Sequence, residues 1–152
     1  MTSGVRLLAC LLVAWGTSVA QAQGSARTSS PLPGKGLAEH DFLYAGESHE
    51  RRIFLVRQGK VVWSYDDPAG KGEVSDAVML SNGNVLFAHQ FGVTEINTDK
   101  KVVWNYDTPT GHEVHTAMPI GKDRVLYIQN GNPAMLRVVN IVTNATEHEI
   151  TL

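Results

Sequence analysis

The sequence predicts an all-β fold built from repeated units of four short antiparallel strands. Val61–Gly70 reads VVWSYDDPAG and returns roughly 40 residues later as Val102–Gly111, which reads VVWNYDTPTG. At about the same offset two shorter segments are also repeated: Glu73–Ala77 as Glu113–Ala117, and Val85–Phe87 as Val125–Tyr127. A period of about 40–50 residues with strand-like segments inside each unit is typical of the blades of a β-propeller.

The composition limits the possible classes of function. The chain has 152 residues, enough for one domain, with 43% hydrophobic residues and a net charge of −2. The sequence has no excess of basic residues and so lacks the charge pattern of a nucleic-acid-binding domain.

Residues 1–22 have the pattern of a secretory signal peptide. Arg6 precedes a short apolar stretch from Leu7 to Trp15, and Ala20-Gln21-Ala22 has the small-x-small pattern of a cleavage site. The apolar stretch is shorter than the ~20 residues of a membrane span. Leu7–Cys10 also resembles a lipoprotein cleavage box, although few apolar residues precede Cys10, the only cysteine. We expect a bacterial protein, secreted to the periplasm or outside the cell, whose mature chain has no disulfide.

A flexible leader rich in Ser, Gly and Pro is predicted over 23–36, and a partial propeller over 37–152. Its blades span about 37–72, 73–112 and 113–152.

Each predicted blade contains short strands separated by polar turns. In the second blade, Val74–Leu80 is mostly apolar, as expected for a strand buried on both faces. Asn82-Gly83 predicts a tight primed hairpin turn. The predicted strands are Phe42–Tyr44, Ile53–Val56 and Val61–Tyr65 in the first blade; Val74–Leu80, Val85–Ala88, Val93–Ile96 and Lys101–Tyr106 in the second; and Val114–Ile120, Val125–Gln129, Leu136–Ile141 and Glu147–Leu152 in the third.

Three blades do not close a ring. Closed propellers have roughly 4–8 blades, and an arc of three leaves two raw sheet edges. We expect the chain to be one part of a longer ring, as a fragment or a truncated gene product. The alternative is an oligomer in which several chains complete the ring.

The distinctive polar residues are predicted to gather at one end of the blades. Successive hairpin turns alternate between the two ends, and the turns at 81–84, 98–100 and 121–123 share one end, where their residues serve turn formation. The opposite end receives the connections between blades, and loops on a rigid scaffold commonly carry binding sites. The candidate ligand-binding residues at this end are Asp76, His89, Gln90, His112, Glu113, His115, Gln129 and Asn130.

His115 is the candidate catalytic residue. It lies with Glu113 where an innermost strand is predicted to begin, so both side chains would reach the central channel, and His89 ends a strand at the same end. Together they would bind a metal ion or act as an acid–base pair. The interpretation we favour is that they hydrogen-bond to the backbone of neighbouring loops. His112 and His115 would not share a face of a strand, so no zinc motif, and no metal site, is predicted.

Four repeated residues are interpreted as structural. Glu73 and Glu113 occupy equivalent positions, and because a catalytic residue is needed only once, their repetition favours a bond between blades. Trp63 and Trp104 lie in the predicted outer strands, where large aromatic side chains bury area between neighbouring blades.

Two positions differ between the copies: Ser75 is replaced by His115, and Asp76 by Thr116. A specific function would be encoded at such differences.

The stretches GKVVWSYD (Gly59–Asp66) and KKVVWNYD (Lys100–Asp107) resemble the tryptophan-bearing repeat of the quinoprotein (PQQ-like) β-propellers. LSNGNVL (Leu80–Leu86) is similar to blades of bacterial arylsulfotransferase-like propellers. The resemblance covers most of 37–152 and implies a propeller fold. Of the quinoprotein docking repeat only Gly59 keeps its place, and no quinone- or calcium-binding set matches, so neither PQQ nor calcium is expected as a cofactor.

These observations favour a secreted scaffold or binding module, with a small molecule, a glycan or a protein held at the end that bears His89, His115 and Gln129. The alternative, implied by the second resemblance, is a sulfuryl-transfer enzyme with His115 as nucleophile. A quinone-dependent dehydrogenase ranks last. We expect no nucleic-acid partner and no membrane span, and we expect further blades or another chain to close the ring.

Overall fold

The computed structural model describes residues 40–46, 51–68 and 72–152, and within these the chain is all β. The signal peptide and leader predicted over 1–36 lie outside the described residues. The strands are β1 (Phe42–Ala45), β2 (Arg52–Arg57), β3 (Lys60–Asp66), β4 (Val74–Met79), β5 (Val85–His89), β6 (Gly92–Ile96), β7 (Val102–Asp107), β8 (Glu113–Ile120), β9 (Arg124–Asn130), β10 (Met135–Asn140) and β11 (Ala145–Thr151).

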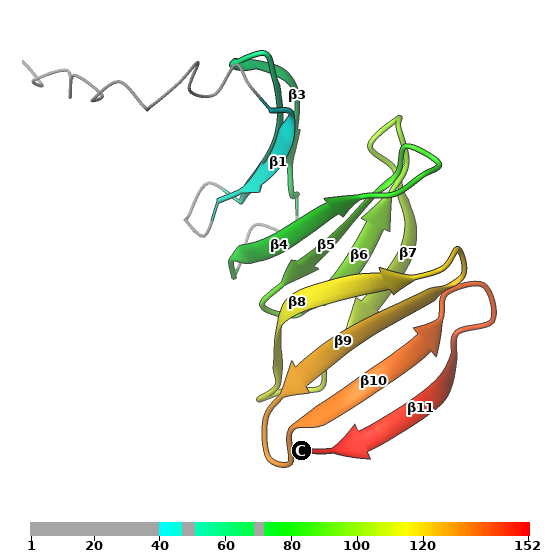
Figure 1. The fold of residues 1–152 in the computed structure, drawn as a ribbon. Coiled ribbons are helices and arrows are strands. Elements are labelled where there is room, and N and C mark those ends of the chain that lie inside the picture. Colours follow the sequence, from blue (N-terminus) through cyan, green and yellow to red (C-terminus); the bar gives the residue numbers. More distant parts are fainter. Residues whose placement is uncertain (1–39, 47–50, 69–71) are drawn as a thin grey trace, which may run out of the picture. The chain divides into compact units, whose positions relative to one another are not determined.

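The strands form three antiparallel sheets in which neighbours in the sequence are neighbours in space (Figure 1). The orders are β1-β2-β3, β4-β5-β6-β7 and β8-β9-β10-β11. This confirms the prediction of three successive antiparallel units with four-stranded blades. The strand positions agree with the predicted ones to within a few residues at each end. The described residues contain no helix that is long and apolar enough to cross a membrane.

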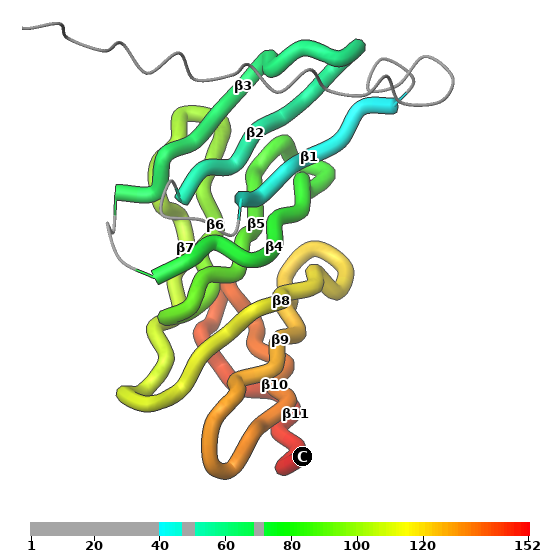
Figure 2. The backbone as a smooth tube through the Cα atoms, turned by 90° about the vertical axis from the view of Figure 1, so that its left-hand side faces the viewer, coloured from blue at the N-terminus to red at the C-terminus, as the bar shows by residue number. Residues whose placement is uncertain are grey.

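The first sheet contains three strands, and they correspond to the last three strands of a blade. The sequence KVVWSYD in β3 is the counterpart of KVVWNYD in β7, so β1 and β2 are the counterparts of β5 and β6. Packing agrees with this assignment, because β1 contacts β4 in the way that β5 contacts β8 (Figure 2). Within the described residues, no strand of the first sheet takes the place that β4 and β8 hold in theirs.

The core lies between neighbouring sheets, and the middle sheet contributes to it from both faces. Every residue of β5 and β6 is buried. Because side chains alternate across a strand, Phe87 packs with Ile53 and Tyr65 on one side. Leu86 packs with Tyr127 and other residues of the third sheet on the other side.

The prediction that Val74–Leu80 is buried on both faces is wrong. In β4 only Val74 is fully buried, and Met79 is exposed. The reason is its place in the sheet: β4 is an edge strand with β5 on one side only. The continuous burial predicted for it belongs to β5 and β6.

The turn after β4 also differs from the primed turn that Asn82-Gly83 predicted. Gly83 N donates to Leu80 O at 3.0 Å and Leu80 N donates to Asn84 O at 2.8 Å, which encloses a three-residue loop. Gly83 has a φ of 85°, in the left-handed region that glycine enters without a steric penalty. A turn followed by one left-handed residue is the common form of a three-residue hairpin loop.

The packing of Trp104 gives a stability prediction. This side chain is 8% exposed, belongs to the core between the second and third sheets, and donates from Nε1 to Asn144 Oδ1 at 2.8 Å. Trp104→Ala should lower the free energy of unfolding by about 3–5 kcal/mol, because it removes buried area and leaves a cavity. Urea unfolding followed by circular dichroism measures the loss.

The matched control is Val103→Ala, since Val103 is the adjacent residue and is 52% exposed. We expect it to change stability by less than about 1 kcal/mol. Equal losses for the two variants would contradict the assignment of Trp104 to the core.

Candidate functional site

The site lies at the end of the sheets where β4 and β8 begin, which we call the rim. The connections at the rim are tied together by backbone hydrogen bonds. Gln90 N donates to Glu73 O at 2.9 Å, and Val114 N donates to Gln90 O at 3.2 Å. The β5–β6 turn is thereby fixed to the starts of both β4 and β8. Side chains on these segments are held by backbone that is itself hydrogen-bonded.

His115 lies between two carboxylates that come from different sheets. Its Nδ1 is 3.1 Å from Glu73 Oε1, and its Nε2 is 3.0 Å from Glu113 Oε2. Ser75 Oγ is 3.5 Å from Nδ1. The His115 side chain is 43% exposed. We call these four residues together with Gln90 the rim cluster.

The arrangement defines what the imidazole of His115 can do. A neutral imidazole donates from one nitrogen only, whereas an imidazolium donates from both. Since each ring nitrogen faces a carboxylate oxygen, the doubly protonated ring is the form that satisfies both contacts. In that form the ring has no lone pair to act as a base or nucleophile.

Glu113 receives hydrogen bonds from two side chains. Its Oε2 pairs with His115, and its Oε1 accepts from Gln90 Nε2 at 3.2 Å. The hydrogen bond with His115, followed by that from Gln90, lowers the pKa of the Glu113 carboxyl below its ordinary value. Both contacts favour the ionised carboxylate.

A second contact between the inner strands lies beside the rim cluster. Asp76 Oδ2 accepts from Thr116 Oγ1 at 2.9 Å and from Ala117 N at 3.3 Å. The positions at which the two repeats differ therefore meet in space, Ser75 with His115 and Asp76 with Thr116. The predicted residue Asp76 joins β4 to β8.

His89 does not join the rim cluster. It is 6% exposed, its Nε2 is 3.1 Å from Thr94 Oγ1, and its ring lies 5.8 Å from that of Phe87 at 46°. Burial lowers the pKa of His89 below its ordinary value of 6.5. Within the described residues, its Nδ1 has no hydrogen-bond partner.

The remaining predicted ligand-binding residues make their hydrogen bonds and ring contacts outside the rim cluster. His112 Nδ1 is 3.4 Å from Thr110 O, and its ring covers Gly131 so closely that a Cβ there would lie 2.2 Å from it. Gln129 is 3% exposed and accepts a hydrogen bond from Tyr106 across the two sheets. Asn130 is exposed at the end of β9. Of the predicted ligand-binding set, Gln90, Glu113 and His115 form the rim cluster, while His89, His112 and Glu113 line a common cavity of about 550 Å³.

The described residues contain no group of three or more histidine, cysteine or acidic side chains placed to hold a metal ion. The two tryptophans of the repeat differ in environment. Trp104 is in the core, whereas Trp63 is half-buried, stacks on Tyr65 at 6.4 Å and lies 5.6 Å from Lys100 Nζ.

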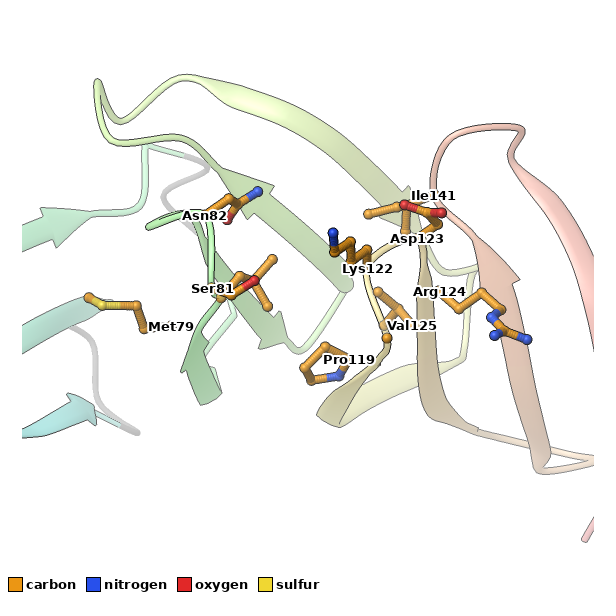
Figure 3. A pocket seen from close by; sticks show the side chains of 11 residues that line it. Met79, Ser81, Asn82, Pro119, Lys122, Asp123, Arg124, Val125 and Ile141 are labelled. Atoms are coloured by element: carbon orange, nitrogen blue, oxygen red, sulfur yellow. The ribbon is translucent and has the colours of Figure 1, made fainter.

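The end opposite the rim holds a cavity that the sequence did not indicate. Turns there were predicted to carry turn residues only, yet Ser81 and Asn82 from one turn and Lys122 and Asp123 from another line a space of about 520 Å³ (Figure 3). Each turn looks ordinary by itself. The cavity exists because the second and third sheets present the two turns side by side.

Comparison with known proteins identifies the fold. No family model matches the chain, and no curated protein matches it. A protein of unknown function from Bacteroides caccae has a similar structure, with a TM-score of 0.61 and 24% identity. The WD40 β-propeller domain of Doa1 has a TM-score of 0.60 and 15% identity. The fold is that of a β-propeller.

The similar structures are longer than this chain. The match covers 72% of this chain and 40% of the Bacteroides caccae protein, and 74% of this chain and 38% of the Doa1 domain. The Neurospora crassa Pan2 WD40 domain has a TM-score of 0.50 and 11% identity. The match covers 72% of this chain and 37% of that domain. The chain thus spans about two-fifths of the propellers that it resembles. At these identities the likeness concerns the fold alone.

The hydrogen bonds to Glu113 predict its titration. Its carboxyl should titrate below the ordinary Glu value of 4.5, because His115 and Gln90 favour the ionised form. A lowered pKa in the folded state adds stability above the unfolded pKa, and this stability disappears as the pH falls through the folded pKa. Carbon-detected NMR of the Glu113 carboxyl measures the midpoint.

His115→Ala should move the Glu113 midpoint upward, and Gln90→Ala should move it by less, because the bond with His115 is the larger cause. An unchanged midpoint in His115→Ala would show that the two side chains are not paired in solution.

Proposed function

We propose that the chain is a secreted scaffold or binding module of the β-propeller class, which receives a small molecule, a glycan or a protein at the rim. The observation that carries this proposal is the rim cluster. Two sheets supply Glu73, Ser75 and Gln90 on one side and Glu113 and His115 on the other. The cluster is partly exposed, charged and held on fixed backbone, as expected for a recognition surface carried by a rigid scaffold.

The position of the cluster supports recognition over catalysis. A histidine nucleophile needs one nitrogen with a free lone pair, usually with a single carboxylate to orient the other nitrogen. Here Glu73 and Glu113 occupy both nitrogens of His115. The sulfuryl-transfer alternative requires Glu73 to leave Nδ1 or Glu113 to leave Nε2 before the ring attacks. Gln90 holds the other oxygen of Glu113 and so opposes the second movement.

Closure of the ring is part of the proposal. The chain spans about two-fifths of the propellers that it resembles, and the first sheet lacks an inner strand among its described residues. We infer that further blades, from the same gene or from another chain, cover the open sheet edges. Secretion to the bacterial periplasm or beyond rests on the signal-peptide pattern of 1–22.

Site-specific photo-crosslinking tests the binding role. A photoreactive residue at Asn130, which is exposed at the rim end, is compared with one at Lys122, which is exposed at the opposite end. Crosslinks made in cells should form at the Asn130 position. The purified partner should bind the Glu73→Gln variant at least tenfold more weakly than the unchanged protein. Crosslinks at Lys122 alone would contradict the proposal.

A transfer assay tests the alternative function. With 4-nitrophenyl sulfate as donor and phenol as acceptor, we expect no transfer above the uncatalysed rate. Transfer that His115→Ala abolishes, with the fold retained, would replace the binding role by the enzymatic one.

A further inference from the structure

A second site lies between two turns at the end of the sheets opposite the rim. The turn between β4 and β5 contributes Ser81 and Asn82, and the turn between β8 and β9 contributes Lys122 and Asp123 (Figure 3). The cavity between these turns has a volume of about 520 Å³. Small-molecule sites span roughly 300–1,000 Å³, so the cavity has room for a small ligand. Its lining includes no residue of the rim cluster.

The least exposed residues of the lining are apolar and belong to the end of the core between the second and third sheets. Val125 is 2% exposed and is part of that core, and Leu80 and Ile141 are half-buried and pack against it. Pro119 adds further apolar surface to the lining. An aliphatic group in the cavity would cover the exposed parts of Leu80 and Ile141. Removal of this apolar surface from water would favour binding.

Hydrogen bonds hold the walls of the cavity in place. Leu80 N donates to Asn84 O at 2.8 Å, and Asn84 N donates to Asn82 Oδ1 at 3.0 Å. Ile141 N donates to Asp123 O at 2.8 Å, which ties the residue after β10 to the turn before β9. The lining is therefore preorganised, and a ligand would not have to order these turns when it binds.

The lining carries one cation and one anion that have no ion-pair partner. The charge of Arg124 is already paired, since its Nη1 lies 3.6 Å from Glu147 Oε2, and its guanidinium points away from the cavity (Figure 3). Lys122 and Asp123 are both exposed. Within the part of the chain that the structure describes, neither forms an ion pair, even with the other.

These two charges indicate the class of ligand. Figure 3 shows the ammonium of Lys122 and the carboxylate of Asp123 on the same side of the cavity, above Pro119. A ligand that pairs with both must carry a negative and a positive charge close together. An α-amino acid has this arrangement, and its side chain can reach the apolar part of the lining. Asn82 Oδ1 is used by Asn84 N, which leaves Asn82 Nδ2 as a further donor.

We propose that this cavity binds the zwitterion of a small aliphatic α-amino acid. Lys122 Nζ and Asn82 Nδ2 donate to the carboxylate of the ligand, and the Asp123 carboxylate accepts from its ammonium. The aliphatic side chain covers Leu80 and Ile141. The site lies at the end opposite the rim cluster and does not depend on the function proposed there.

NMR titration of the full chain with L-leucine tests the proposal. The resonances of Ser81, Lys122 and the Ile141 methyl groups should shift together and reach saturation. Two analogues each lack one charge: 4-methylpentanoate has no ammonium, and 3-methylbutylamine has no carboxylate. We expect each to bind about fivefold more weakly than L-leucine, because the lost ion pair lies at an exposed position. Glycine keeps both charges but has no aliphatic group, and it should bind at least about fivefold more weakly.

Two variants separate the contributions of the two charges. Lys122→Gln should weaken L-leucine binding about fivefold and should not weaken the binding of 3-methylbutylamine. Asp123→Asn should weaken L-leucine binding by a similar factor and should not weaken the binding of 4-methylpentanoate. Lys101→Gln is the matched control and should change none of these affinities, because Lys101 is an exposed lysine at the same end of the sheets that does not line the cavity.

Equal affinities for L-leucine and its two singly charged analogues would overturn the proposal. Shifts that do not saturate with L-leucine would also overturn it and would leave Lys122 and Asp123 as solvated turn residues. The resonances of Ser75 and His115 should not move in these titrations, since both residues lie in the rim cluster. A negative result at the cavity would therefore leave the function proposed for the rim standing.

Discussion

The burial of the middle sheet on both faces is the constraint on which the rest of the structure depends. No residue of β5 or β6 is exposed, and alternate side chains enter two different cores. Phe87 packs towards the first sheet and Leu86 towards the third, so a shift of one residue in either strand would exchange both cores. This requirement fixes the register of the middle sheet, and the register determines which residues reach the rim.

Regular stacking of repeats explains how a unique residue acquires paired partners. When successive sheets stack with the same register, equivalent positions become neighbours in space: Ser75 lies against His115 and Asp76 against Thr116. The repeated acid is then available twice, once from each copy. His115 occurs in one copy only and lies between Glu73 and Glu113. Repetition of the carboxylates and divergence of the histidine together produce the carboxylate–imidazole–carboxylate arrangement.

Sequence reasoning succeeded for features that depend on one strand or on the repeat. The strands and the order in which they pair follow from the short apolar segments, the turns between them and the 40-residue period. Sequence reasoning failed for features that depend on the packing or pairing of other strands. The apolar pattern of Val74–Leu80 does not reveal that β4 is an edge strand, and nothing near His89 in the sequence shows that Thr94 and Asn105 will surround it. Those partners come from strands whose pairing is set by the core.

His89 and His115, two of the histidines at the rim end, show how the fold gives one residue type different environments. His115 is exposed on an inner edge strand, where both ring nitrogens lie within 3.1 Å of carboxylate oxygens. His89 ends a strand that is buried on both faces, where desolvation favours the neutral ring and a threonine fixes its tautomer. Both nitrogens of the first have partners within the protein, whereas Nδ1 of the second is buried and has no hydrogen-bond partner in the described residues. The position of a strand within its sheet therefore decides whether a histidine at this end of the molecule is buried or exposed.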